Sequence, residues 1–195
     1  MVNNSHPVWK QRNEEYRKAI EDRSVSVVIL GPAKNNTGFE KRSKIKEHLM
    51  GLSTHYDVAF PEEIKIPPGM LPDDSEWTKI NYIVGNAEVI IALLIDDIKV
   101  TGVLTEISKY SGFSGFREKA FLLVPKERTK WKRGAPLIWE SVKDFPRERK
   151  LSYTDDEFAT CNKIRDFAGS VVDAFRKQAT YKIFQEKHGM RQEPI

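Results

Sequence analysis

The sequence predicts an α/β protein, a three-layer sandwich in which helices cover both faces of a parallel central sheet. Three observations predict this fold. Short apolar runs of strand length alternate with longer segments whose apolar residues recur at helical spacing. The apolar runs are continuous rather than alternating, which is typical of strands buried on both faces. Runs of turn-forming residues separate the segments.

The first part of the chain predicts two helices and two strands. Residues 8–22 have a helical composition and precede "SVSVVIL" (24–30), a β-branched apolar run that predicts a buried strand. In residues 39–52 the apolar side chains recur at roughly helical spacing, which predicts an amphipathic helix. "YDVAF" (56–60) alternates as expected of a second strand, and a proline-rich loop follows it.

The middle of the chain predicts a helix, a strand and another helix. Residues 75–87 carry one apolar helical stripe, and Ser75 is suited to cap its N-terminus. "EVIIALLI" (88–95) is the clearest strand in the sequence. Residues 101–113 predict a short helix, which Gly112 is suited to end.

The last part predicts one strand and one long helix. "AFLLVP" (120–125) is an apolar run closed by a proline, and residues 126–150 are basic and irregular. Residues 155–178 have the spacing of a long amphipathic helix.

This order of elements is typical of Rossmann-like and flavodoxin-like sandwiches. The length of 195 residues fits one domain over residues 1–195, with a core at 24–125 and the helices 8–22 and 155–178 as appendages. Right-handed crossovers place the carboxyl ends of all the strands at one edge, where such folds bind ligands.

Composition narrows the classes of function. With 39% hydrophobic and 31% charged residues, the chain has the balance of a soluble globular protein. No apolar run reaches the length of about 20 residues that a membrane helix needs, and the N-terminus lacks a secretory signal, so we expect a cytoplasmic protein. A single cysteine, Cys161, and four scattered histidines exclude the usual zinc spacings.

Candidate binding residues follow the expected strands. "LGPAKNNTGF" places Gly31, Pro32 and Asn35 after the first strand, where backbone N–H groups and an amide can reach a small ligand. An ordinary βα turn has the same composition, and the segment is neither a Walker A loop nor a dinucleotide fingerprint. Asp96 and Asp97 end the third strand, where a carboxylate can accept hydrogen bonds from ribose hydroxyls or cap a helix.

Glu106 and Asp96 are the candidate catalytic residues, and Glu106 is the one that would act on the anomeric carbon while Asp96 orients the ribose hydroxyls. The evidence for Glu106 is its setting. It lies among apolar and small neighbours, a setting that tunes a carboxylate to act as a nucleophile or to stabilise an oxocarbenium-like charge. An exposed helix residue is the alternative. Trp77 could stack on a base or belong to the core, and Lys34 or Arg42 could hold a phosphate or lie on a solvated helix face.

Four motifs in order carry a resemblance to a known family. They are "ILGP", "YDVAFPEE", "NAEVIIALLIDD…TGVLTEISKY" and "KAFLLVP", which together span about residues 24–125. The chain here resembles the nucleoside 2-deoxyribosyltransferase family and the related Rossmann-like and TIR-like nucleotide-processing domains. The resemblance implies cleavage or transfer of an N-glycosidic bond, with Glu106 attacking or stabilising the anomeric carbon.

The resemblance also implies roles for other residues and for partners. Residues that match family positions, or lie beside one, are Gly31, Pro32, Asp96, Gly102 and Tyr110. The family has an acid where this chain has Val100, which favours the alternative of a catalytically inactive nucleotide-binding sensor or interaction module of the same fold. Family members complete their sites with a neighbouring subunit, so a homo-oligomer is implied.

The expected partner is a small molecule, namely a nucleoside, a nucleotide or NAD as a substrate. No metal or organic cofactor is implied. The net charge of +4 is mild, and the basic stretch 126–134 is typical of a solvated loop, so we expect no nucleic-acid binding.

Overall fold

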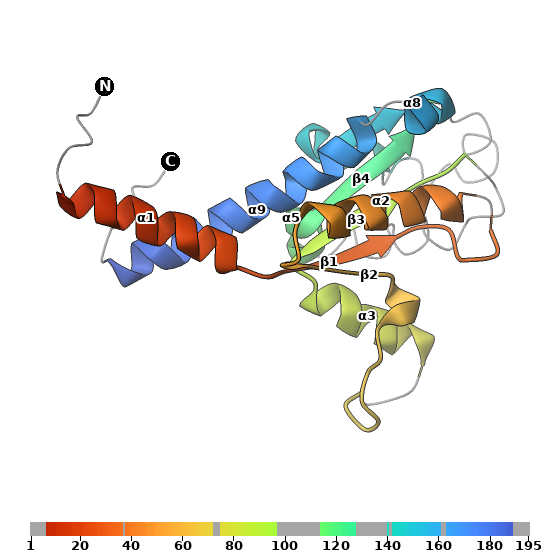
Figure 1. Ribbon diagram of the computed structural model, residues 1–195. Coiled ribbons are helices and arrows are strands. Elements are labelled where there is room, and N and C mark those ends of the chain that lie inside the picture. The colour runs from red at the N-terminus through yellow and green to blue at the C-terminus, as the bar shows by residue number, and fades with distance from the viewer. Residues whose placement is uncertain are drawn as a thin grey trace.

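A five-stranded parallel sheet forms the centre of the molecule. The computed structural model describes residues 7–36, 38–71, 75–96, 114–127, 140, 142–160 and 163–188. The strands are β1 (Val25–Leu30), β2 (Tyr56–Ala59), β3 (Val89–Leu93), β4 (Ala120–Pro125) and β5 (Lys150–Tyr153). All neighbours pair in parallel in the order β2-β1-β3-β4-β5, which confirms the predicted α/β sandwich (Figure 1).

Helices cover both faces of this sheet. The described helices are α1 (Pro7–Asp22), α2 (Phe39–Leu52), α3 (Glu76–Asn86), α5 (Ser114–Lys119), α8 (Asp155–Thr160) and α9 (Lys163–Lys187), with short 3-10 turns η1 (Pro61–Glu63) and η3 (Arg147–Arg149). Helices α2 and α9 pack side by side on one face, whereas α3 and α5 lie on the other (Figure 1). None of the described helices is both long and apolar enough to cross a membrane.

The strand order fixes where the chain reverses its direction through the sheet. From β1 the chain crosses to β2 on one side and then returns past β1 to β3 on the other side. Every residue of β3 is buried, because helices cover this central strand on both faces. The carboxyl ends of β1 and β3 therefore flank a topological switch point, the usual ligand site of open α/β sheets.

Helix α9 belongs partly to the core and partly to an arm. Its first half buries Ile164, Ala168 and Val172 against the sheet layer. Its second half extends beyond the sheet together with α1 (Figure 1). There the Tyr16 ring lies 5.4 Å from that of Phe184, and the Tyr16 hydroxyl donates to the Lys177 carbonyl at 3.2 Å. We call this pair of helix segments, residues 7–22 and 175–187, the arm.

The structure differs from the predicted elements in three places. Strand β5 was not predicted, and its sequence "KLSY" explains why, because three of its four residues are only half-buried. The described residues of the predicted helix 155–178 belong to α8 and α9, and α9 continues to Lys187 because the arm contacts stabilise it. The short helix α5 was not predicted either, and the predicted helix 101–113 lies outside the described residues.

Candidate functional site

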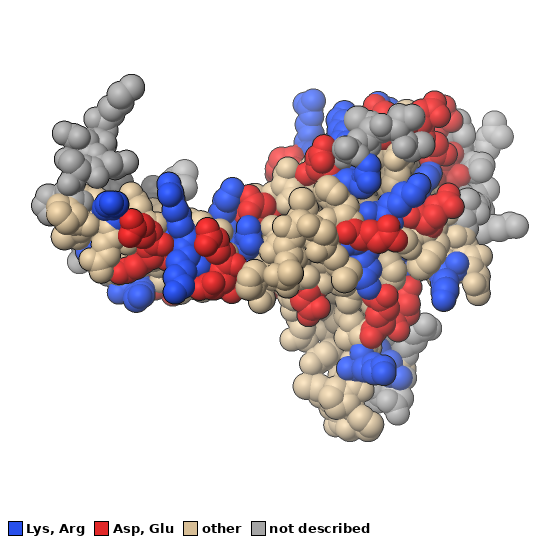
Figure 2. All heavy atoms as spheres, viewed as in Figure 1, with Lys and Arg blue, Asp and Glu red and all other residues tan. Residues whose placement is uncertain are grey.

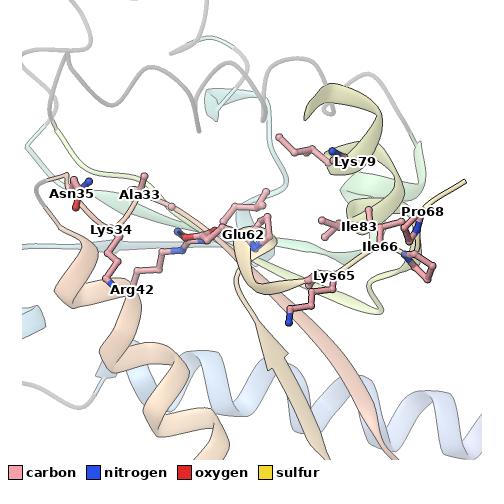
Figure 3. A pocket seen from close by; sticks show the side chains of 16 residues that line it. Ala33, Lys34, Asn35, Arg42, Glu62, Lys65, Ile66, Pro68, Lys79 and Ile83 are labelled. Carbon is pink, nitrogen blue, oxygen red and sulfur yellow. Dashed lines mark hydrogen bonds and ion pairs between the residues drawn. The ribbon is translucent and has the colours of Figure 1, made fainter. Parts of the chain in front are cut away.

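A large cavity opens at the carboxyl edge of the sheet beside β1 and β2. Its volume is about 1020 Å³, and Figure 3 shows side chains that line it. Three elements supply its walls: the loop after β1, the loop after β2, and α3. The lining residues used below are Gly31, Lys34, Asn35, Arg42, Glu62, Ile64, Lys65, Ile66, Lys79, Ile80 and Ile83. The cavity lies at the edge where the parallel topology predicts a ligand site.

The loop after β1 packs tightly against the end of β3. A Cβ atom on Gly31 would lie 3.1 Å from the Arg42 Cδ and 3.4 Å from the Leu93 Cβ. Gly38 has a φ of 88°, and a Cβ there would lie 3.0 Å from Ile95 Cγ2. Glycine is therefore favoured at residue 31 by the close approach of Arg42 and at residue 38 by both conformation and space. These contacts hold the cavity loop beside Asp96.

Arg42 is a buried clamp rather than a ligand-binding cation. Only 2% of its surface is exposed, and all five of its N–H donors are occupied. Nε and Nη2 donate to the Ile29 carbonyl at 3.1 and 2.8 Å, and Nη1 donates to the Pro32 carbonyl at 3.1 Å. The fork also makes two bonds to the Glu62 carboxylate, at 2.8 and 2.9 Å (Figure 3).

The clamp joins the two loops of the cavity. Glu62 belongs to the turn after β2, whereas Ile29 and Pro32 lie at the end of β1, so Arg42 ties the first cavity wall to the second. The Phe60 ring centroid lies 4.1 Å from the guanidinium carbon and adds a cation–π contact. The sequence suggested that Arg42 holds a phosphate or lies on a solvated helix face, and both predictions are wrong. All of its donors are already bonded within the protein, and its side chain is buried.

Glu63 fixes the turn that presents Glu62. Its carboxylate accepts hydrogen bonds from the Phe60 backbone N–H and from Lys46. Burial would raise the pKa of the Glu63 carboxyl, but the hydrogen bonds from Lys46 and Phe60 outweigh it and hold this pKa below its usual value. The charged form of Glu63 therefore stabilises the turn at neutral pH.

Asp96 has a carboxylate oxygen without a partner. Its Oδ1 atom is buried and accepts no hydrogen bond from any part of the chain that the structure describes. Leaving a buried acceptor unpaired costs about 1–3 kcal/mol. Asp96 follows Ile95, which touches Gly38 of the cavity loop, so this oxygen lies at the same edge as the cavity.

The predicted site residues fall into three groups. Gly31 and Asn35 line the cavity, and Asp96 lies at the same edge. Pro32 is buried and contributes its carbonyl to the Arg42 clamp. Asp97, Gly102, Glu106 and Tyr110 lie outside the described residues, and so does the side chain of Trp77, whose backbone belongs to α3.

Sequence reasoning missed the residues of the second wall. Glu62, Lys65 and Lys79 line the cavity, but they come from a proline-rich loop and from the polar side of a helix, where charge is ordinary. The sequence did hold a signal for Arg42, because it lies three residues from both Phe39 and Ile45 on the apolar stripe of α2. A cation in such a stripe indicates a buried, paired side chain.

The described residues of the lining suit a small anionic or amphipathic ligand. Within the described ranges, no three His, Cys, Asp or Glu side chains come together in a way that could hold a metal ion. The cavity instead combines lysines with aliphatic side chains of Ile64, Ile66, Ile80 and Ile83. A few polar groups on an otherwise apolar lining are typical of a small-molecule site.

Comparison with known proteins gives a distant structural similarity. The sequence matches no protein family, and it matches no curated protein. Among solved structures, the chain is similar to a conserved protein from Enterococcus faecalis V583, with 17% identity and a TM-score of 0.43. The similarity covers 76% of this chain and 97% of that chain.

Proposed function

We propose that the protein binds a nucleoside or nucleotide in the cavity and cleaves or transfers its N-glycosidic bond. The observation that carries the proposal is the cavity of about 1020 Å³ at the carboxyl edge of the parallel sheet, between the loops after β1 and β2. Open α/β sheets bind their ligands along this edge. The lining supports the proposal, because lysines suit phosphates and the isoleucines suit the flat face of a base.

The environment of Asp96 is consistent with the binding of a sugar at this edge of the sheet. Its buried Oδ1 lacks a donor among the described residues, and a ribose hydroxyl is a donor of the right size. Under this proposal, ligand binding satisfies the oxygen and returns the free energy that its burial costs. The same resemblance that pointed to Asp96 as a substrate-binding residue is the basis for Glu106 as the catalytic one.

The proposed reaction breaks the bond between C1′ and the base nitrogen. The bonding electron pair leaves with the base, which takes up a proton, and the Glu106 carboxylate stabilises the positive charge at C1′ or bonds to it. Water then adds its hydroxyl to C1′ and releases a proton, which gives free sugar and free base. In a transfer reaction, a second base nitrogen attacks C1′ in place of water.

A sensor that binds the same ligand without turnover is the second candidate. The observation that favours it is Val100, which stands where the related family carries an acid. Binding and turnover separate these two functions, so the experiment must measure both.

The test is a matched pair of measurements on purified protein with nucleosides, their 5′-monophosphates and NAD. Calorimetry measures binding, and chromatography measures released base. We expect the parent to bind and release base, and Glu106→Gln to bind equally while its base release falls at least about 100-fold. Glu118→Gln is the control, because Glu118 is exposed on α5, which leads into the opposite end of β4.

The outcomes divide the candidates. Binding without any released base supports the sensor and overturns the enzyme. Base release that survives Glu106→Gln shows that another residue performs the chemistry. If none of these ligands binds, both functions are wrong. The homo-oligomer implied by the resemblance stays a prediction, which light scattering of the purified protein checks.

A further inference from the structure

The lining of the cavity gathers positive charge. Its described lining carries four basic side chains, Lys34, Arg42, Lys65 and Lys79, and one carboxylate, Glu62, a net of +3. The whole chain has a net charge of only +4. Over the face seen in Figure 2, basic and acidic residues intermingle instead.

The carboxylate of the cavity does not offset the lysines. Both Glu62 oxygens accept bonds from Arg42, so this pair is neutral as a unit. Lys34 comes from the loop after β1 and Lys65 from the loop after β2, on either side of the pair (Figure 3). Neither ammonium group has an ion-pair partner in the described ranges of the chain.

Three lysines elsewhere in the described ranges pair with a carboxylate of another element. Lys41 pairs with Asp155, Lys46 with Glu63 and Lys126 with Glu157. Among the described residues that line the cavity, Glu62 is the one carboxylate. Lysine side chains that line one cavity without an acidic partner favour the binding of an anion there.

We infer that the ligand of this cavity is phosphorylated, and that Lys34 and Lys65 hold its phosphate. This inference rests on the proposed nucleoside site and names its substrate class as a nucleoside phosphate. Lysine is a common phosphate ligand as a point charge on a flexible stem. The volume of about 1020 Å³ lies at the upper end of ligand cavities and has room for either one nucleotide or a dinucleotide.

The apolar part of the cavity lining supports the same ligand. Ile64 and Ile66 flank Lys65 in the second loop, and Ile80 and Ile83 face the cavity from α3. The cavity therefore offers aliphatic surface together with its lysines. A nucleoside phosphate has both kinds of surface, an anionic phosphate and an apolar, flat base.

The experiment compares nucleosides with their phosphorylated forms. Each ligand is measured on the parent protein and on variants that lack two lysine charges. Calorimetry measures adenosine, guanosine, cytidine and uridine, their 5′-monophosphates, NAD and inorganic phosphate. The test variant is Lys34→Met/Lys65→Met. The control is Lys44→Met/Lys182→Met, which removes the same charge from exposed positions outside the cavity.

We expect the parent to bind one monophosphate or NAD at least about tenfold more tightly than the matching nucleoside. The Lys34→Met/Lys65→Met variant loses this preference, the control keeps it, and raising the salt concentration weakens the phosphorylated ligand alone. A monophosphate that binds as well as NAD indicates a single phosphate, whereas a stronger NAD indicates two.

Each failure has its own pattern. If the parent binds nucleosides and monophosphates with equal affinity, the phosphate inference is wrong and the proposed function still stands. The same holds if the preference for the monophosphate survives the loss of both lysines. Inorganic phosphate that competes as well as a nucleotide keeps the phosphate site but overturns the nucleoside function. If neither nucleosides, nucleotides nor phosphate bind, both proposals fail.

Discussion

At the scale of single residues, Arg42 decides the shape of the cavity. Its aliphatic stem packs against Gly31, and its guanidinium group binds the Glu62 carboxylate, so this one charged side chain connects the two cavity loops. The planar guanidinium satisfies two backbone carbonyls and one carboxylate at once, which the three donors of a lysine ammonium cannot reproduce in this fixed geometry.

Replacing Arg42 with methionine tests this role. The change leaves the carbonyls of Ile29 and Pro32 without their donor, while Glu62 is exposed enough to turn toward water. We expect a loss of about 3 kcal/mol in the free energy of unfolding, measured by urea denaturation. Lys44→Met on the same helix changes it by less than about 0.5 kcal/mol. Equal stability of the two variants would contradict the clamp.

The site was only partly predictable at this scale, for physical reasons. Gly31, Asn35 and Asp96 were found because topology alone sends the residues after a parallel strand to the ligand edge. The roles of Arg42 and Glu62 depend on a pair formed across two loops, 20 residues apart in sequence. Such a pair leaves no periodic signal, and a proline-rich loop gives no indication of which of its charges face inward.

At the scale of elements, prediction succeeded where the sequence carries a hydrophobic pattern and failed where it carries none. The predicted strands β1, β3 and β4 are apolar runs, and β2 alternates between buried and exposed side chains. The predicted N-cap Ser75 accepts the Thr78 backbone N–H at 3.2 Å. Strand β5 has a lysine, a serine and one fully buried residue, Tyr153, so no hydrophobic pattern indicates it. Its position is set by pairing with β4, which is a tertiary effect.

Tyr153 holds this unpredicted strand against the sheet. Its hydroxyl donates to the Leu94 carbonyl just beyond β3, and its ring lies 5.6 Å from that of Phe158. Burial raises the pKa of the Tyr153 phenol well above its usual value. Its stabilising effect is therefore complete below the unfolded pKa of about 10 and is lost as the pH rises toward the higher folded pKa.

Tyr153→Phe tests this linkage by urea denaturation at pH 8 and pH 11. At pH 8 the variant loses about 1–2 kcal/mol of unfolding free energy, because the buried Leu94 carbonyl has lost its donor. At pH 11 the difference from the parent shrinks by about 1 kcal/mol, since only the parent carries the phenol that ionises on unfolding. A difference that does not change with pH would show that Tyr153 is not the titrating group.

At the scale of the whole molecule, the structure divides into a rigid body and the arm. The body has its core in the sheet, whereas α1 has no buried residue and rests on the distal part of α9. Tyr16 supplies two of the aromatic contacts and one hydrogen bond of the arm. The arm should therefore open locally at a lower free energy than the body.

Tyr16→Ala is expected to release α1 without unfolding the sheet. Amide hydrogen exchange in residues 7–22 should accelerate at least about tenfold, because two ring contacts worth about 0.5–1.5 kcal/mol each are lost. Exchange in β3 should not change. Trp9→Ala is the control, since 55% of Trp9 is exposed. Faster exchange in both regions would mean that the arm and the body unfold together.

The two outermost strands of the described sheet have a consequence for its behaviour at high concentration. Strands β2 and β5 are each only four residues long, and they carry the exposed Asp57 and the partly exposed Lys150. The long apolar strands lie between them, away from any free backbone edge. Short, charged borders give another chain little to pair with, so the sheet is protected against edge-to-edge aggregation.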